Sequence, residues 1–335
     1  MMPDADFTHL LHLTDERGTF EHALFCEARP EHGYCTDDMA RVLVVAAREP
    51  RPLPAVRDLV GLSLRFLGEA QDLDGRYRNR MDHRGRWLDR PSVGDCWGRS
   101  LWGLGTAAAR SATERVRENA TAQFERAARH RSPSRRAMAF ATLGAAEVLA
   151  ANPTNRVARD LVTAAADGMT LSGDGPGWPW PEPRLAYANA ALPEAMIAAG
   201  TLLERPALRE NGFMLLRWLL DLQSLDGHLS VVPAGGAGFG DTRPGFDQQP
   251  IEVAAIADAC ARASAVDNDP RWSKGVTAAI EWFLGANDGA RAMWDPATGG
   301  GFDGLHVDGV NLNQGAESTI ALLSTLQHTR SMAAR

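Results

Sequence analysis

The feature that most constrains the fold of this chain is an internal repeat. One type of segment occurs six times, at intervals of about 55 residues between Asp37 and Gln314. Each copy starts with polar, often acidic or proline-marked residues and continues into a run rich in Ala, Leu, Val and Gly. The starts are residues 36–41, 94–99, 132–136, 187–189, 247–252 and 313–318. A period of this length indicates a repeated supersecondary unit that buries its apolar surface against its neighbours.

The apolar runs and the segments between them predict two kinds of helix. The runs are apolar almost all round, which is typical of helices buried on every side, and they cover residues 42–47, 101–109, 137–146, 190–199 and 253–261. Gly103, Gly105 and Gly144 would let such helices approach closely. The intervening segments carry one apolar stripe and one charged face and cover residues 56–71, 115–129, 155–169, 207–222 and 272–284. We interpret these as outer helices, with residues 7–13 supplying the last one.

These alternating helices predict an all-α fold, an (α/α)6 barrel of six helical hairpins in a single domain over residues 1–335. No segment has a clear alternating strand pattern, and residues 229–232 form at best a short ribbon. The loops from outer to inner helices are long and cover residues 71–93, 170–184, 224–249 and 287–313, whereas opposite loops such as 48–54 are short. Long loops concentrate function, so we expect the site where the inner helices begin.

Composition narrows the classes of protein that remain. A 44% hydrophobic share with 23% charged residues suits a folded core, and a net charge of -7 without a basic tract disfavours nucleic acid and anionic membranes as partners. The chain has neither a secretory signal pattern nor a run of about 18 apolar residues that a membrane span requires. The four cysteines form no C-x-x-C pair, so we expect reduced thiols, a cytoplasmic location, and no metal or cofactor.

Acidic residues gather at the starts of the inner helices. Asp37 and Asp38 follow Thr36, a good N-cap residue, and the helix dipole alone favours acids there by about 0.3–1 kcal/mol. The i,i+4 spacing of Asp37 and Arg41 also allows an ion pair, as does that of Asp95 and Arg99. The acids that share this location are Asp37, Asp38, Asp95, Asp247, Glu252 and Glu317.

Carboxylates that share a partly buried pocket can split their pKa values into one acid and one base, as glycoside hydrolysis requires. We therefore expect Asp38, Asp95 and Glu317 to provide the acid and base roles, with Asp37 tuning them through Arg41. Aromatic rings suit the C–H faces of sugars, and amides and arginines suit their hydroxyl groups. The residues expected to bind substrate on this basis are Tyr34, Arg41, Trp97, Arg99, Trp178, Trp180, Tyr187, Asn189, Asp247, Gln248, Gln249, Glu252, Asn313 and Gln314. The alternative for Trp97 is a place in the core.

Several stretches resemble a family of bacterial helical domains in the six-hairpin glycosidase-like group. They are Phe20-Glu21-His22-Ala23, residues 33–41, residues 98–105, Asp247-Gln248-Gln249-Pro250 and residues 313–319, so the resemblance spans nearly the whole chain. Members are often called glycosyltransferases because many are fused behind, or encoded beside, a transferase domain. Two positions depart from the family pattern: Ala188 stands where relatives tend to have Asp, and Met39 where Asn is more usual.

The resemblance implies a six-hairpin barrel that acts on carbohydrate. Our leading hypothesis is a glycoside hydrolase acting on an oligosaccharide or glycoconjugate, with an inverting mechanism by fold analogy. Similar barrels also include sugar epimerases, which use paired histidines, and lyases; the histidines here do not fall at inner-helix starts. A third class is a non-catalytic carbohydrate-binding barrel with a functional link to a separate glycosyltransferase. No nucleotide-sugar motif is visible, so the transferase label is not carried over to this chain.

Overall fold

The computed structural model describes residues 3–169 and 177–333. The chain packs into two compact units, which are treated separately below. The first unit is Leu10–Gly168, and the second combines Met1–His9 with Met169–Arg335.

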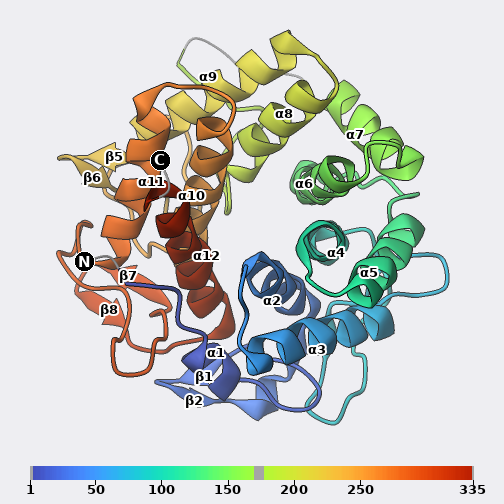
Figure 1. Cartoon of the computed structure of the whole chain (residues 1–335). Helices are drawn as coiled ribbons and strands as arrows, with labels where there is room; N and C mark the ends of the chain where they lie inside the picture. The colour runs from blue at the N-terminus through green and yellow to red at the C-terminus, as the bar shows by residue number, and fades with distance from the viewer. Residues whose placement is uncertain (1–2, 170–176, 334–335) are drawn as a thin grey trace. The chain divides into compact units, whose positions relative to one another are not determined.

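The first unit consists of three helical hairpins in chain order. They pair α2 (Thr36–Arg48) with α3 (Pro54–Ala70), α4 (Asp95–Arg110) with α5 (Glu114–Ala127), and α6 (Arg135–Ala151) with α7 (Arg156–Gly168). The first helix of each hairpin is buried almost all round, and α4 packs between α2 and α6 (Figure 1). The second helices bury one face only, as their amphipathic sequences predict.

Glycines bring the three inner helices of the first unit into backbone contact. A Cβ added at Gly103 on α4 would lie 2.5 Å from the carbonyl oxygen of Ala40 on α2. A Cβ at Gly144 on α6 would lie 2.1 Å from the carbonyl oxygen of Leu101, and one at Gly105 would lie 2.1 Å from that of Gly144. No larger residue fits such an approach, so the prediction of close packing through these glycines is confirmed.

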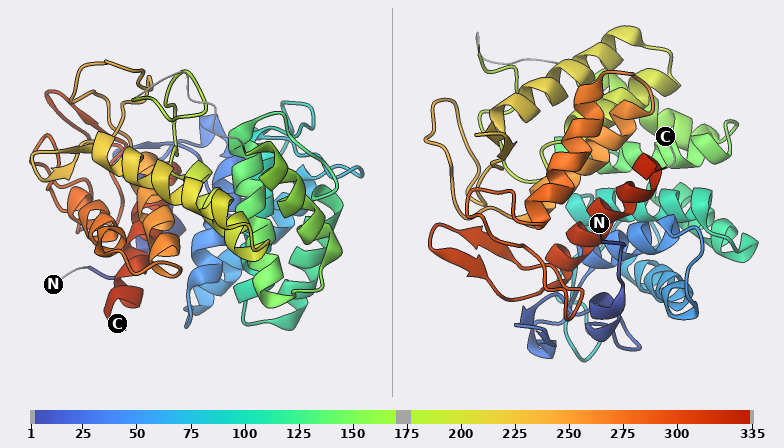
Figure 2. Two further views of the ribbon diagram at one scale, coloured as in Figure 1. Left: turned by 90° about the horizontal axis from the view of Figure 1, so that it is seen from above. Right: turned by 60° about the vertical axis from the view of Figure 1, so that its left-hand side comes forward.

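The second unit repeats the hairpin pattern. It pairs α8 (Ala191–Leu202) with α9 (Pro206–Leu222) and α10 (Pro250–Ser264) with α11 (Pro270–Phe283), and it ends in α12 (Ala316–Ala333). Helix α10 packs between α8 and α12 (Figure 2). The expected outer helix over residues 7–13 is the five-residue α1 (Thr8–His12), and its His9 bonds the carbonyl oxygen of Gln314 through Nε2 at 2.8 Å.

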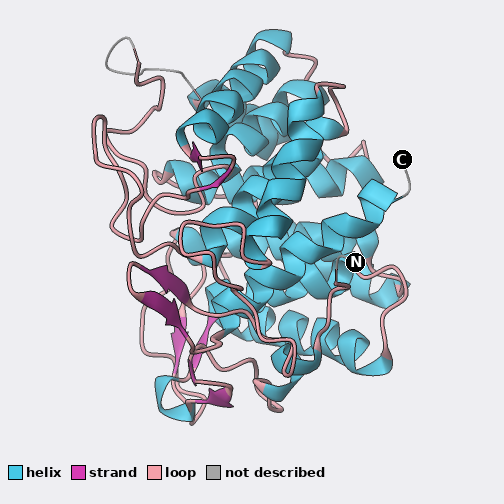
Figure 3. Cartoon of the chain, turned by 90° about the vertical axis from the view of Figure 1, so that its left-hand side faces the viewer, coloured by secondary structure: helices cyan, strands magenta, loops and turns pink. Residues whose placement is uncertain are grey.

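The strands of the described residues are short ribbons within the connections between helices (Figure 3). Four antiparallel pairs join β1 (Ala23–Leu24) with β2 (Glu27–Ala28), β3 (Tyr34–Cys35) with β4 (Arg80–Met81), β5 (Ser224–Leu225) with β6 (His228–Leu229), and β7 (Gly304–His306) with β8 (Gly309–Asn311). A 3-10 turn, η1 (Pro30–His32), precedes β3. The ribbon expected at residues 229–232 therefore lies earlier, with its second strand ending at Leu229.

The long connections lie before α4, α10 and α12, where the loop lengths predict them. The loop expected at 170–184 lies partly outside the described residues, which resume at Gly177. Within the described part of the chain, no helix has the length and apolar character that crossing a bilayer would require.

Candidate functional site

The start of α2 is fixed by a strand from the loop that precedes α4. Cys35 pairs with Arg80 in the β3–β4 ribbon, and the N–H of Thr36 donates to the carbonyl oxygen of Asn79 at 2.9 Å. The Thr36 hydroxyl donates to the carbonyl oxygen of Arg78 at 2.7 Å. The expectation that Thr36 caps α2 is therefore wrong: Thr36 is the first helical residue, and its hydroxyl serves the neighbouring strand instead.

The two aspartates of the first turn of α2 have different arginine partners. Arg99 on α4 donates from Nη1 to Oδ1 of Asp37 at 2.9 Å, and both side chains are buried. Arg41 donates from Nη2 to Oδ1 of Asp38 at 2.5 Å and from Nε to the carbonyl oxygen of Asp37 at 3.3 Å. The side chain of Arg41 thus engages Asp38 at i,i+3, while the carboxylate of Asp37 is bound from the next inner helix.

The arginines keep Asp37 charged despite its burial. Burial alone would raise the pKa of Asp37, but the charges of Arg99 and Arg41 outweigh this effect and hold that pKa below its ordinary value. The Asp37 N–H also donates to Oδ1 of Asn79 at 3.3 Å. Asp37 is therefore a fixed anion and suits the orienting role expected of it better than that of a proton donor.

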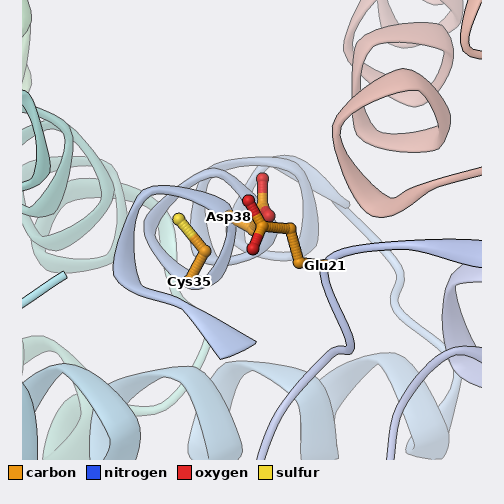
Figure 4. A group of neighbouring side chains, drawn as sticks. All are labelled: Glu21, Cys35 and Asp38. Carbon is orange, nitrogen blue, oxygen red and sulfur yellow. The ribbon is translucent and has the colours of Figure 1, made fainter. Parts of the chain in front are cut away.

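A third carboxylate, from Glu21, joins the start of α2. Potential ligand atoms of Glu21, Cys35 and Asp38 all lie within 4.8 Å of one another (Figure 4). Arg80 forms an ion pair with Glu21, and Arg41 binds Asp38. Burial and then the neighbouring carboxylates raise the pKa of the Cys35 thiol well above its usual range. Because arginines already supply the positive charge and the thiol is neutral, the donor set does not favour a metal ion.

The other predicted site residues of the first unit differ in how far they are buried. Asp95 begins α4, is partly exposed, and accepts a long hydrogen bond of 3.5 Å from the Ser134 hydroxyl. Trp97 is fully buried and donates from Nε1 to the carbonyl oxygen of Ala127 at 3.1 Å. Tyr34 is also buried, and its hydroxyl donates to Asp15 at 2.6 Å. Trp97 and Tyr34 therefore present no surface to a ligand in this structure and pack as core residues.

In the second unit, Glu252 organises the first turn of α10. Its carboxylate is 2% exposed and accepts hydrogen bonds of 3.0 Å from the N–H and Nδ2 of Asn189 and from Nε2 of Gln223. The Gln223 Oε1 in turn accepts from the N–H of Val232 at 2.8 Å. Two of the predicted residues, Asn189 and Glu252, are thus in direct contact and join the segment before α8 to the first turn of α10.

A second polar network surrounds Asp288, which the sequence did not single out. His228 lies 2.9 Å from it through Nε2, and Gln248 donates to it from Nε2 at 2.5 Å. Burial acts to raise the pKa of Asp288, but the hydrogen bonds from Gln248 and His228 outweigh burial and lower it. Nearby, all three guanidinium nitrogens of Arg243 are buried without a hydrogen-bond partner among the described residues.

The remaining polar residues of the second unit lie around α10 and α12. Asp247 is exposed and pairs with Nδ1 of His306 at 3.1 Å, and Gln249 is the partly exposed N-cap residue of α10. Gln314 is buried and accepts from the Thr298 hydroxyl at 2.6 Å. Asn313 and Glu317 are partly exposed, and Glu317 lies in the first turn of α12 as predicted.

The aromatic residues expected to bind sugar fall into buried and exposed groups. Trp180 and Trp178 are buried against Trp218 of α9, with ring centroids 6.1 and 5.1 Å from that ring. Tyr187 is exposed, and so is Phe239, whose ring lies 6.4 Å from that of Trp178. Within the described residues, the second unit therefore offers Tyr187 and Phe239 as exposed aromatic surface, while the tryptophans support the loop beneath.

No protein-family model matches this chain, and no curated protein matches its sequence. Solved structures, in contrast, match the chain in fold. A sugar epimerase from a ruminal bacterium superposes with a TM-score of 0.71 at 13% identity, covering 97% of this chain and 95% of the other. The cellobiose 2-epimerase from Spirochaeta thermophila DSM 6192 gives 0.70 at 13% identity, with coverage of 97% and 93%. The cellulase Cel9M of C. cellulolyticium, in complex with cellobiose, gives 0.64 at 7% identity, with coverage of 96% and 88%.

These likenesses show the fold. The chain is an all-α protein of the (α/α)6 barrel class, and the fold prediction is confirmed. Each unit brings together part of the predicted site: Asp37, Asp38, Arg41 and Arg99 in the first, and Asn189 with Glu252 in the second. No role was predicted from the sequence for Glu21, Arg243 or Asp288. Only Glu21 carried a signal, since it lies in a stretch that resembles the six-hairpin family.

Proposed function

We propose that the chain is a carbohydrate-active enzyme, and specifically a glycoside hydrolase that acts on an oligosaccharide or glycoconjugate by carboxylate acid/base catalysis. The observation that carries the proposal is the pair of buried aspartates in the first turn of α2, each held by an arginine. Water-excluded carboxylates with fixed partners provide the preorganised charge that an oxocarbenium-like transition state requires. The fold neighbours add support, because they include two sugar epimerases and a cellulase.

The surroundings of the carboxylates suggest which one acts as the acid and which as the base. Asp38 has a cationic partner in Arg41 and suits the base, while Asp37 orients it as a second fixed anion. Asp95 starts the adjacent inner helix and is partly exposed, which suits the proton donor; Glu317, in the first turn of α12, is the other candidate acid. We retain the inverting mechanism by analogy with the fold, and proton NMR of the first-formed anomer tests it.

The test is turnover of an oligosaccharide panel by Asp38→Asn and Asp95→Asn, measured by mass spectrometry of the products. Each variant should lose at least about 100-fold in turnover if it removes a general acid or base. Asp258→Asn is the matched control, because Asp258 is also a buried carboxylate on an inner helix, held by Ser324 and His328. Turnover by both site variants at the rate of the control would contradict the catalytic roles of Asp38 and Asp95.

A sugar epimerase is the second candidate, favoured by two histidine–carboxylate pairs in the second unit. His228 pairs with Asp288, and His306 pairs with Asp247, and a carboxylate partner suits a histidine that moves protons. The long loops before α10 and α12 carry these residues. They are joined because the backbone N–H groups of Gln248 and Leu305 each donate to the carbonyl oxygen of the other. Conversion of a disaccharide to an isomer of the same mass, lost in His306→Gln, would select this function over hydrolysis.

Binding without turnover is the third outcome. A non-catalytic barrel serving a separate glycosyltransferase would retain oligosaccharide intact after long incubation at high enzyme concentration. The same panel distinguishes it, since bound ligand would be recovered at its original mass and with its original anomeric composition.

A further inference from the structure

The loop before α4 concentrates arginine in a chain that is acidic overall. Residues 72–93 hold six arginines and four aspartates, whereas the whole chain has a net charge of -7. Within this loop, residues 77–92 form a hairpin, closed at its base by two hydrogen bonds between Tyr77 and Ser92 and continued by the bridge from Met81 to Trp87. We call this segment the 77–92 hairpin.

Carboxylates of this loop are turned inward and shape its turns. Asp72 accepts from the N–H groups of Asp74 and Arg76, and Asp82 accepts from those of Arg84 and Arg86. These bonds, with that of Gly85 to the Asp82 carbonyl, fold two similar tight turns. Asp72 and Asp82 therefore both bind backbone N–H groups of the loop, and Asp82 also forms an ion pair with Arg86.

The other acids are engaged as well. Asp89 accepts from the N–H groups of Asn79 and Arg80 at 2.7 and 2.9 Å. Asp74 lies 3.3 Å from Arg76 and 3.6 Å from His130. Every aspartate of the loop thus has a partner within it or beside it.

The arginines divide into a paired and an unpaired set. Arg76, Arg80 and Arg86 form ion pairs with Asp74, Glu21 and Asp82. The side chains of Arg78, Arg84 and Arg90 have no hydrogen-bond or ion-pair partner among the described residues; Arg84 and Arg90 are exposed and Arg78 is partly so. These positive charges therefore remain available to a ligand.

A further arginine reaches the same turn from a different segment. The guanidinium of Arg17 lies over Gly85, so closely that an added Cβ there would meet Nη1 at 2.3 Å. Arg17 also has no side-chain hydrogen-bond or ion-pair partner in the described part of the chain. Arg17 therefore adds a further positive charge at the turn that contains Arg84 and Arg86.

The hairpin is also attached to the proposed catalytic aspartates. Its residues 78 and 79 accept the hydroxyl and the N–H of Thr36, and the Asn79 side chain binds the N–H of Asp37. At the start of α2, each carboxylate has its own arginine: Arg41 with Asp38, Arg80 with Glu21, and Arg99 with Asp37. The interior of this site is thus balanced in charge, and the hairpin beside it carries an excess of positive charge.

We propose that the 77–92 hairpin, with Arg17, receives an anionic substituent (a sulfate, phosphate or carboxylate) of the carbohydrate that binds at the start of α2. The inference rests on the proposed function, because it assigns the substrate class to that same site. Guanidinium groups bind such anions through paired N–H donors, and unpaired positive charge also speeds the approach of a charged ligand. Arginines can also donate hydrogen bonds to the hydroxyl groups of a neutral sugar, but only an anionic substituent would be paired with their positive charge.

The first test compares dextran sulfate with dextran, which share the same sugar backbone and differ in charge. The full chain should be retained on immobilised dextran sulfate at low salt, should be released on raising NaCl to about 0.5 M, where screening is strong, and should pass through dextran. The double variant Arg84→Ala/Arg90→Ala should bind dextran sulfate at least about tenfold more weakly. Polygalacturonate and a phosphorylated starch then distinguish carboxylate and phosphate from sulfate.

The matched control is Arg115→Ala/Arg156→Ala. Both residues are exposed arginines of the same unit without side-chain partners among the described residues, and they lie at the starts of outer helices α5 and α7. This control changes the net charge by the same amount and should bind dextran sulfate as tightly as the parent chain. Passage of the parent chain through dextran sulfate, or equal weakening in both double variants, would overturn the inference. Hydrolysis of a neutral oligosaccharide with either of these results would leave the proposed function intact.

Discussion

Arg99 of α4 binds Asp37 of α2 at 2.9 Å, so a buried ion pair joins the starts of two adjacent inner helices. The guanidinium of Arg99 also lies 5.0 Å from the ring centroid of Phe140 on α6. One side chain on the middle helix of the first unit therefore contacts both of its neighbours. Breaking this pair should affect the packing of all three helices as well as the charge of the site.

Arg99→Met should destabilise the chain by about 3–5 kcal/mol, because it leaves the Asp37 carboxylate buried without its main cationic partner. Adding Asp37→Asn to that variant should restore part of the loss, since the uncompensated charge is then removed. Urea denaturation of the two single variants and the double variant measures the coupling between the residues. If the two losses simply add, the pair is not coupled, and Arg99 acts through its packing on Phe140 alone.

Acid should weaken the first unit through Asp37. The pKa of Asp37 is lower in the folded chain than its ordinary value of 3.8. A carboxyl whose pKa is depressed by folding stabilises the chain above its unfolded pKa, and this stabilisation is lost as the pH falls through the folded pKa. The difference in unfolding free energy between the parent chain and Asp37→Asn should therefore be largest at pH 6 and shrink below about pH 4. A difference that stays constant down to pH 2 would contradict this account.

The helices of the fold were predictable because each leaves a periodic signal in the sequence. The buried run at residues 101–109 lies within α4 (Asp95–Arg110), and the amphipathic stretch at 207–222 nearly coincides with α9 (Pro206–Leu222). Proline and aspartate also mark several helix starts, as at α11, where Asp269 is the N-cap residue and Pro270 the first helical residue. Such signals are local, so they can be recognised in the sequence without knowing what packs against each helix.

The partners of the polar residues were not predictable from spacing. The i,i+4 separation of Asp37 and Arg41 suggested an ion pair between them, yet the Asp37 carboxylate bonds Arg99, which is 62 residues away. Trp178 and Trp180 were expected to bind sugar, but both are buried and their rings lie against Trp218 of α9. In each case the deciding contact comes from a residue distant in the sequence, and no local pattern encodes it.

Arg243→Met should cost little stability, in contrast to Arg99→Met. Burial lowers the pKa of Arg243, and its guanidinium nitrogens have no hydrogen-bond partner among the described residues, so the native state gains few contacts from this charge. Replacing a buried charge by an apolar side chain of similar length is often neutral or stabilising. Urea denaturation should show a change of less than about 1 kcal/mol or a gain. A loss as large as that of Arg99→Met would mean that attraction to Asp288 and Glu252 outweighs burial.

Two glycine-to-alanine changes on helices should have opposite effects. Gly61 lies on the exposed side of α3 with no atom within 4 Å of an added Cβ, whereas a Cβ at Gly144 of α6 would lie 2.1 Å from the backbone oxygen of Leu101. Alanine is favoured over glycine in a helix by about 1 kcal/mol, so Gly61→Ala should stabilise the chain by roughly that amount. Gly144→Ala gains the same propensity but forces α4 and α6 apart and should destabilise the chain by about 1–3 kcal/mol or more. Thermal denaturation of both variants checks the contrast. A stabilised Gly144→Ala would show that α4 and α6 do not approach as closely as described.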